Sequence, residues 1–543
     1  MKKLSLILLA IAIILGIATR FYKLGLAPAG LYLDEAGQGY SAYSILKTGK
    51  DEFGKSFPIV FRSFTDFKTP VYIYLVVPLI PIFGLTPFAV RFPSFFFSIL
   101  TIPILYFLIK EISQSKISNK LAALAAILIA ISPWHILFGR TNFECNVALF
   151  FFLTGILFFY KALKNPKLLI PAAVFFAIAT PSYHAQRIVT PLMLLVLFIR
   201  HRKIFLSQTH RKFLVIGAIV GLIISAPTLS VATTPGFLAR ANGLNIVSQN
   251  GQKPASFFTV TKEFGALYLS YFSPRSMFVL GDSGPRSSFP ELSTFFLWQF
   301  PFYIYGLYIF VKRKDLGELK FFTLALLLVS PIPAALTRDP YSTIRSLQMV
   351  IPLIIIISMG ILGVYEKISK AWSASPVKTK RLKILFWLTF SIAIIYSIAK
   401  LYSSIIVLNE YYRAKDWNYG WEIATEEIKR LDQNLPIIVD NSRDEPYIQL
   451  AFFLKEDPTK FSLDNFEVTP NDYYTNMKRN RNKIVGQITT KPIEWEKDLK
   501  IKQYLIGDAL AISDQQIKEH NLTLIKDIYY PDGSIVLRIV ETN

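Results

Sequence analysis

Two neighbouring acids, Asp34 and Glu35, stand in the segment LYLDEAGQGYSAYSILKTG, directly behind an apolar run over residues 4–19. An ionised carboxylate can accept the proton of a hydroxyl group, so this pair is a candidate for general-base chemistry. The alternative is structural, because an acid in the first turn of a helix is favourable and LDEAGQGYSAYSIL has helical spacing. Capping explains one acid better than two, and both interpretations stay open at this point.

Further polar residues stand in segments that separate other apolar runs. Lys68, in DFKTPVYIYL, suits either a phosphate contact or a lysine that snorkels to the membrane surface. Three more segments, SPWHILFGRTNFECN, TPSYHAQRIVTP and LTRDPYSTIRSLQ, supply the remaining candidates: Asn142, Glu144, Tyr183, His184, Arg187, Arg338, Asp339 and Arg345. Each of these alone is more often an interfacial polar residue. If the segments meet on one side of a membrane, they form a pocket of carboxylates and bases.

The elements that position these residues are membrane spans. The chain is 52% hydrophobic and only 18% charged, a composition typical of a polytopic membrane protein. About eleven stretches approach the length that crosses a bilayer; they lie near 4–20, 91–109, 121–138, 147–160, 168–181, 188–199, 213–232, 294–311, 321–336, 347–364 and 384–406. The net charge of +22 comes from basic clusters between apolar runs, a pattern that sets topology and argues against nucleic-acid binding. The single cysteine, Cys145, excludes an internal disulfide.

The basic clusters decide the orientation. With the amino terminus in the cytoplasm, each of them falls on an inner turn, provided that the run 70–84 is not counted as a span. That run contains three prolines, which favour a re-entrant or surface-lying segment. Residues 21–90 and 233–293 then become outer loops, and the Asp34–Glu35 pair lies at the outer boundary, where a charge costs less than at mid-bilayer.

The character of the sequence changes near Tyr411. Runs such as LPIIVD, YIQLAFFL, KIVGQI, QYLIGDALAI and SIVLRIV resemble strands, and WEIATEEIKRL resembles a helix. We therefore expect a mainly α-helical, multi-pass plasma-membrane domain over 1–409 and a small extracytoplasmic α/β domain over 410–543.

The segments YLDEAGQGYSAYSILKTGKDEFG, FKTP, RFPSFFFSILTIPILYFLIKEI and SPWHILFGRTNFECN resemble the polytopic C-type (GT-C) glycosyltransferases that use polyprenyl-phosphate sugars. The nearest likeness is to bacterial relatives of the protein O-mannosyltransferases and to the lipid A aminoarabinose transferases. It runs through residues 1–430 and implies a GT-C-like fold with a polyprenyl-phosphate sugar as donor. Lys68 matches the lysine of the E-K-P-P element that meets the lipid phosphate, although Phe67 and Thr69 depart from that element.

The resemblance implies catalytic roles for Asp34 and Glu35, with Asp34 as the base of an inverting displacement. Lys68, Arg345 and Arg187 are expected to bind the donor phosphate. Glu144 falls where related enzymes carry a second acidic motif, and the metal requirement stays open. The acceptor is a hydroxyl group on a protein, a lipid or a glycan. A transporter or flippase of lipid-linked sugars, a glycan polymerase or ligase, and a receptor that senses through its tail are the alternatives.

Overall fold

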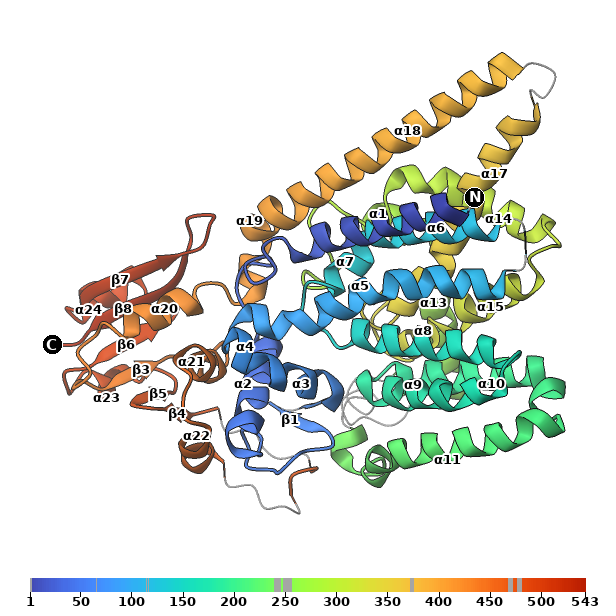
Figure 1. The fold of residues 1–543 in the computed structure, drawn as a ribbon. Coiled ribbons are helices and arrows are strands. Elements are labelled where there is room, and N and C mark those ends of the chain that lie inside the picture. Colours follow the sequence, from blue (N-terminus) through green and yellow to red (C-terminus); the bar gives the residue numbers. More distant parts are fainter. Residues whose placement is uncertain are drawn as a thin grey trace. The chain divides into compact units, whose positions relative to one another are not determined.

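The computed structural model describes residues 2–64, 66–113, 115, 117–238, 246–247, 256–371, 376–466, 472–475 and 481–543. Of the predicted outer loop 233–293, residues 239–245 and 248–255 lie outside the described part. The chain forms two compact units (Figure 1). The helical unit comprises Met1–Tyr22, Ser94–Ser230 and Ala241–Ser404, and the loop-and-tail unit comprises Lys23–Pro93, Val231–Arg240 and Ile405–Asn543.

The helical unit is a bundle built from the predicted apolar stretches, each of which contains helix. Its helices are α1 (Lys2–Phe21), α5 (Pro87–Ile112, which begins in the other unit), α6 (Ser118–Ala130), α7 (Pro133–Phe138), α8 (Cys145–Ala162), α9 (Leu169–Ser182), α10 (Gln186–Phe205), α11 (Gln208–Ser230), α13 (Phe257–Ser270), α14 (Phe300–Lys312), α15 (Gly317–Val329), α16 (Ile332–Ala335), α17 (Val350–Ala371) and α18 (Pro376–Tyr402).

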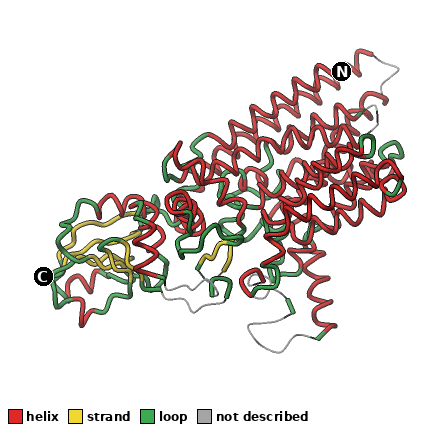
Figure 2. Tube along the Cα trace, turned by 60° about the horizontal axis from the view of Figure 1, so that its bottom comes forward, coloured by secondary structure: helices red, strands yellow, loops and turns green. Residues whose placement is uncertain are grey.

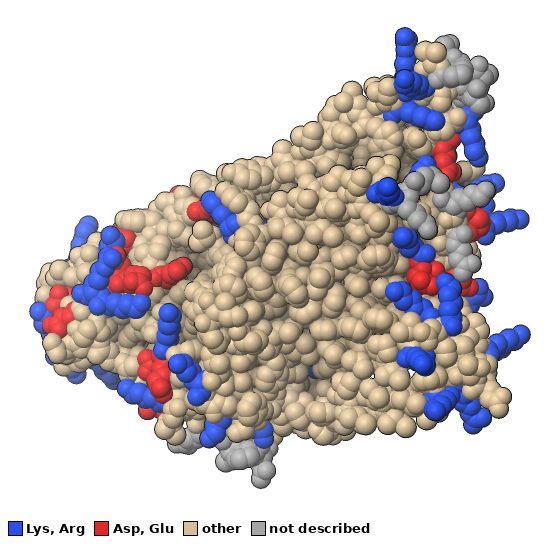
Figure 3. Space-filling view, in the orientation of Figure 1, with Lys and Arg blue, Asp and Glu red and all other residues tan. Residues whose placement is uncertain are grey.

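Within the described residues, seven helical segments are long and apolar enough to cross a membrane: Lys3–Phe21, Pro87–Ile112, Cys145–Ala162, Gln208–Ser230, Gly317–Ala335, Leu347–Lys370 and Thr379–Trp417. The remaining stretches form shorter or less apolar helices, so the total of eleven spans stays a prediction. On the face drawn in Figure 3, Lys and Arg side chains gather at one end of the bundle, and the surface along its helices is almost uncharged. The side of the membrane that this end faces also stays a prediction.

The loop-and-tail unit begins with the first predicted outer loop. Here α2 (Leu33–Thr48) is followed by a hairpin of β1 (Phe61–Ser63) and β2 (Asp66–Lys68), in which Phe61 pairs with Lys68. The proline-rich run 70–84 forms α3 (Pro70–Val76), a 3-10 turn (Val77–Leu79) and α4 (Ile80–Phe83). Pro78 and Pro81 remove backbone donors and so divide the run into short helical pieces. Whether this segment enters the membrane stays a prediction.

The tail contains a six-stranded mixed sheet, and the tube in Figure 2 shows its strands gathered together. The strand order is β4-β5-β3-β6-β8-β7, with β3 (Ile437–Val439) parallel to β5 (Ile488–Thr490) and β6 (Tyr504–Gly507). The other pairs are antiparallel and involve β4 (Lys483–Val485), β7 (Thr523–Tyr529) and β8 (Ile535–Glu541). The helices are α19 (Asn409–Arg413), α20 (Trp421–Ile428), α21 (Pro446–Leu454), α22 (Pro458–Asn465), α23 (Trp495–Asp498) and α24 (Asp514–Glu519).

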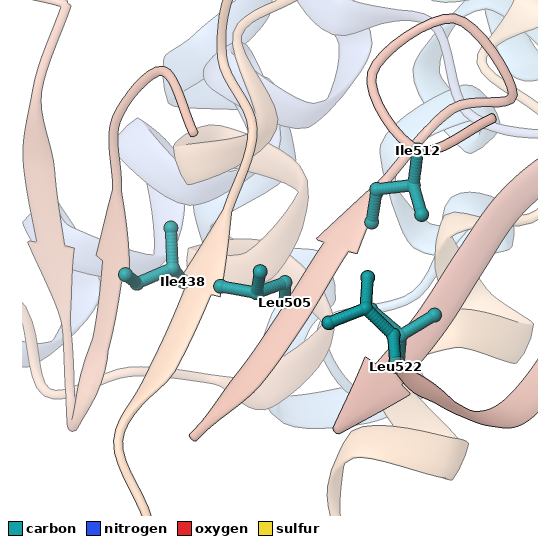
Figure 4. Packing of buried hydrophobic residues seen from close by; sticks show 5 residues of the cluster. Ile438, Leu505, Ile512 and Leu522 are labelled. Atoms are coloured by element: carbon teal, nitrogen blue, oxygen red, sulfur yellow. The ribbon is translucent and has the colours of Figure 1, made fainter. Parts of the chain in front are cut away.

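One strand prediction in the tail is wrong. The run YIQLAFFL forms α21, with Pro446 as its first residue, whereas the other runs supply strands as expected. Proline is favourable at the start of a helix. Because the whole of Pro446–Phe452 is buried, the sequence of this helix lacks the polar residues at helical spacing that would mark it as a helix. The sheet has its own core, in which Ile438, Leu505, Ile512 and Leu522 cluster (Figure 4).

Helix α2 packs closely against the tail. A Cβ atom added at Gly39 would lie 2.6 Å from the ring of Phe452, so a larger residue there would force a side chain of this contact to move. The Tyr40 hydroxyl donates to the Glu456 carbonyl at 3.1 Å. The helix that carries Asp34 and Glu35 is therefore built into the same compact unit as the carboxyl-terminal sheet.

Candidate functional site

Asp34 lies in the first turn of α2 and forms an ion pair with Lys68. The Lys68 Nζ donates to Asp34 Oδ2 at 2.7 Å, and the two side chains are 7% and 22% exposed. Lys68 ends β2, so the β1–β2 hairpin carries the ammonium to the start of the helix. The structure therefore brings together two residues that lie 34 positions apart in the chain, one anionic and one cationic, at a site that solvent can reach.

Glu35 has a different environment from its neighbour. Its side chain is fully buried, and its two oxygens accept from Arg91 Nε at 3.0 Å and Arg91 Nη2 at 2.8 Å. Arg91 also donates to the carbonyls of Pro28 and Gly30, and the backbone N–H of Tyr32 donates to Glu35. Glu35 and Arg91 thus join the segment before α2 to α5. Whether Glu35 also takes part in catalysis stays a prediction.

The other predicted site residues lie in the helical unit. Arg345 forms an ion pair with Asp339 and donates to Thr337 Oγ1 at 2.8 Å, and Arg338 is exposed nearby. Asp339 and Arg345 are therefore brought together, as two of the three charged residues in the segment LTRDPYSTIRSLQ.

The remaining candidates flank the ends of three helices. Asn142 is buried, and Glu144 directly precedes α8. Tyr183 directly follows α9, and its ring centroid lies 6.3 Å from that of His184. Arg187 lies in the first turn of α10. That these residues line one pocket with Asp34 and Lys68 stays a prediction.

A second polar cluster lies inside the loop-and-tail unit. Tyr473 donates to Asp51, whose other oxygen accepts from the backbone N–H groups of Phe53 and Lys55. Burial raises the pKa of the Asp51 carboxyl to about 6, and burial together with the neighbouring Asp51 raises that of Glu52 well above its usual range. These acids join the first loop to the tail and do not contact Asp34 in any interaction that we observe among the described residues.

The helical unit contains an apolar cavity. It has a volume of about 430 Å³ and is lined by residues of α8, α9, α10 and α11, of which Thr180, Thr190 and Ser225 are polar. Within the described part of the chain, no group of three or more His, Cys, Asp and Glu side chains is arranged to hold a metal ion.

Sequence reasoning missed two residues that shape the site. Arg91 opens an apolar run, FAVRFPSFFF, and an arginine at that place is a signal for a buried acidic partner. Asn418, which follows the last long helix, accepts a hydrogen bond from the first residue of α2. No local pattern in the sequence marks that contact, because its partners lie 385 positions apart.

Three comparisons with known proteins bear on this geometry. Residues 67–230 match the family model described as dolichyl-phosphate-mannose-protein mannosyltransferase. The fold is similar to that of ArnT from Cupriavidus metallidurans in the apo state, with a TM-score of 0.54 and 12% identity over 98% of this chain and 97% of that one. No curated protein matches the chain in sequence at a significant level.

Two further solved structures share the architecture. ArnT from the same organism bound to undecaprenyl phosphate gives a TM-score of 0.51 at 13% identity, over 98% of this chain and 97% of that one. The archaeal oligosaccharyltransferase AglB from Archaeoglobus fulgidus, in complex with an inhibitory peptide and a dolichol-phosphate, gives 0.53 at 14% identity, over 98% of this chain and 74% of that one. At these identities the likeness establishes the fold.

The fold is that of the GT-C class of polytopic membrane proteins, with a carboxyl-terminal domain built on a mixed sheet. The match over residues 67–230 adds the enzyme class. Over residues 67–230 the chain resembles the protein mannosyltransferases, and together with the fold this match indicates a membrane glycosyltransferase, as the sequence resemblance predicts.

Proposed function

We propose that this glycosyltransferase transfers a sugar from a polyprenyl-phosphate donor to a hydroxyl acceptor on the extracytoplasmic face of the membrane. The Asp34–Lys68 ion pair is the observation that carries the proposal. Sugar transfer needs a base for the acceptor proton and a cation for the departing phosphate, and this pair supplies one of each. The related ArnT is described as bound to undecaprenyl phosphate and AglB to a dolichol-phosphate, which supports a lipid phosphate as leaving group.

The proposed reaction is a single displacement, in which one bond forms as another breaks. The acceptor oxygen bonds to the anomeric carbon while its proton passes to the Asp34 carboxylate. The bond between the anomeric carbon and the phosphate oxygen breaks, and its electron pair stays with the lipid phosphate, which Lys68 stabilises through a charge-assisted hydrogen bond. One displacement inverts the anomeric configuration. Arg345 and Arg187 are further candidates for phosphate binding.

The bundle offers room for the lipid part of the donor. The apolar cavity among α8, α9, α10 and α11 has a lining suited to isoprenoid units, which offer no hydrogen-bonding groups.

The test compares envelope proteins and lipids by mass spectrometry in cells that carry the wild-type gene, no gene, or Asp34→Asn. We expect a sugar mass on a hydroxyl-bearing product that requires the wild-type gene and is absent with Asp34→Asn. Glu422→Gln is the control, because Glu422 is an exposed acid of the same unit, on α20. Wild-type product levels from a correctly inserted Asp34→Asn protein would refute the base assignment.

The same experiment separates the transferase from a transporter of lipid-linked sugars. A transporter changes the side on which the lipid-linked sugar is found and forms no new glycosidic bond. Loss of the product together with accumulation of the intact polyprenyl-phosphate sugar supports transfer. Movement of the intact donor by a protein that forms no product would refute it.

A further inference from the structure

The start of α2 is held by side chains from the carboxyl-terminal tail. The Asn418 Oδ1 accepts from the backbone N–H of Leu33, the first residue of α2, at 3.1 Å. Gln449, which is fully buried on α21, donates to the carbonyl of Leu31 at 2.7 Å. Two residues of the tail therefore fix the backbone directly before Asp34.

Asn418 caps helix α2 although it lies far from this helix in the sequence. The first N–H groups of a helix have no acceptor within the helix, and a side-chain oxygen placed there stabilises the first turn. Such an oxygen ordinarily comes from the residue before the helix. Here that residue is Tyr32, whose side chain makes no such cap, and the oxygen comes from a residue 385 positions away from Leu33.

Asn418 is itself held in one orientation. Its Nδ2 donates to Asp444 Oδ2 at 2.9 Å, so the amide oxygen is directed to Leu33. Its φ of 51° lies in the left-handed region, which asparagine and glycine adopt more easily than other residues. Asp444 Oδ1 in turn accepts from the N–H of Glu445, directly before α21. The chain of contacts runs from α21 through Asp444 and Asn418 to the first turn of α2.

The neighbouring Trp417 tightens the same junction. It is fully buried, its ring lies edge-on to that of Tyr32 at 6.2 Å, and its carbonyl would lie 2.3 Å from a Cβ atom at Gly30. Trp417 thus packs against the segment that precedes α2, and Asn418 caps the helix itself.

We propose that Asn418 is a positioning residue for the proposed base: through the Leu33 N–H it fixes the first turn of α2, and so the carboxylate of Asp34, for proton transfer. The inference rests on the proposed function of Asp34. It gives the carboxyl-terminal domain a role in transfer, beside any role in acceptor binding. A one-ångström displacement of a reacting group can lower a rate by about a hundredfold, so a single cap at this place affects turnover.

The test uses full-length protein in lipid nanodiscs and two substitutions that separate the cap from the backbone. Asn418→Gly removes the acceptor and keeps the left-handed conformation. The exchange of Asn418→Asp with Asp444→Asn keeps an acceptor for Leu33 and restores the hydrogen bond between positions 418 and 444 with its direction reversed. Asn441→Ala is the structural control, because Asn441 donates to the carbonyls of Arg481 and Thr490 inside the tail, away from α2.

Two properties are measured for each variant. Amide hydrogen exchange of the first turn of α2 reports the cap directly, and we expect it to become about fivefold faster in Asn418→Gly, as the loss of one cap predicts, and to return to the wild-type rate in the exchange variant. Transfer from undecaprenyl-phosphate mannose reports the base, and we expect kcat about tenfold lower in Asn418→Gly, with KM within twofold of wild type and recovery in the exchange variant.

The outcomes test the positioning role of Asn418 separately from the proposed role of Asp34 as base. Asn441→Ala is expected to lower thermal stability with wild-type exchange at α2. Unchanged exchange of the first turn in Asn418→Gly would overturn the positioning role, whatever the activity. Faster exchange with wild-type kcat would overturn the link to catalysis, provided that Asp34→Asn is inactive. An active Asp34→Asn protein would refute the proposed function instead.

Discussion

Lys68 Nζ lies 2.7 Å from Asp34 Oδ2. The group proposed to hold the donor phosphate is therefore paired with the group proposed to take the acceptor proton. Under the proposed function, a donor phosphate that binds Lys68 would displace Asp34 from this ion pair and free the proposed base for the acceptor.

Removal of this lysine affects the donor first. Lys68→Ala should raise KM for a polyprenyl-phosphate sugar about tenfold to a hundredfold, the range for loss of a charge-assisted hydrogen bond worth about 1.5–3 kcal/mol. Lys68→Arg should retain part of the affinity, since it keeps the charge on a different geometry. Steady-state kinetics with varied donor measures both. Lys460→Ala, at an exposed lysine of α22, is the control. A wild-type KM in Lys68→Ala would remove the phosphate role.

The buried pair of Glu35 and Arg91 makes a separate prediction about stability. Substitution of one partner leaves the other charge buried without it, which costs about 3–5 kcal/mol. Arg91→Met and Glu35→Gln should each lower Tm in detergent, and the double variant should lose less than the sum of the two losses. Additive losses in this double-mutant cycle would show that the two side chains do not interact.

Glu35 and Asp34 also differ in their expected effect on turnover. Glu35 is fully buried against Arg91, so we expect it to hold the segment before α2 in place. The folded fraction of Glu35→Gln should therefore keep measurable transfer, whereas Asp34→Asn should have none. Equal loss in both variants, per folded enzyme, would favour a direct role of Glu35 in the reaction.

The sequence predicts much of this fold because apolar length is a local property. Each predicted stretch is helical, and the turn in YYPDGSIVLRIV does lead into β8. The run YIQLAFFL failed because a helix buried on every side lacks the alternation that distinguishes it from a buried strand. Asp34 and Lys68 could be chosen from residue type, yet their pairing depends on how the hairpin folds back.

Apolar length and residue type do not reveal the residues that support the site. Arg91 and Asn418 act through contacts with residues far away in the chain, and neither belongs to a short motif. Glu35 shows the same limit, because adjacency to Asp34 suggests a shared role, whereas the structure gives the two acids different partners and different burial.

The close approach at Gly30 yields a prediction with a matched control. Gly30 has a φ of 92°, and an added Cβ would lie 2.3 Å from the Trp417 carbonyl and 2.8 Å from the Tyr419 nitrogen, which are backbone atoms that cannot easily move. Gly30→Ala should therefore lower the free energy of unfolding by roughly 2–4 kcal/mol. Gly265→Ala, where nothing lies within 4 Å, should be neutral or slightly stabilising in helix α13. Equal Tm values for the two variants would contradict this packing.

Asp51 makes the stability of the loop-and-tail unit depend on pH. Burial raises its pKa to about 6 from an ordinary value of 3.8, so the folded protein keeps this proton where the unfolded chain has lost it. The stability that the protonated form contributes is fully present below pH 3.8 and is lost as the pH rises through 6. At neutral pH the ionised carboxylate costs roughly 3 kcal/mol.

Asp51→Asn should remove this dependence. The amide cannot ionise, and its oxygen can still accept from the N–H groups of Phe53 and Lys55. Between pH 4.5 and 7.5 the Tm of the wild-type protein should fall relative to that of Asp51→Asn, because only the wild-type protein pays the cost of ionisation. Thermal unfolding across that range, with Asp432→Asn as an exposed acid for control, measures the difference. Parallel curves for wild type and Asp51→Asn would mean that the carboxylate beside Tyr473 is charged in the folded protein at no cost, against the burial observed here.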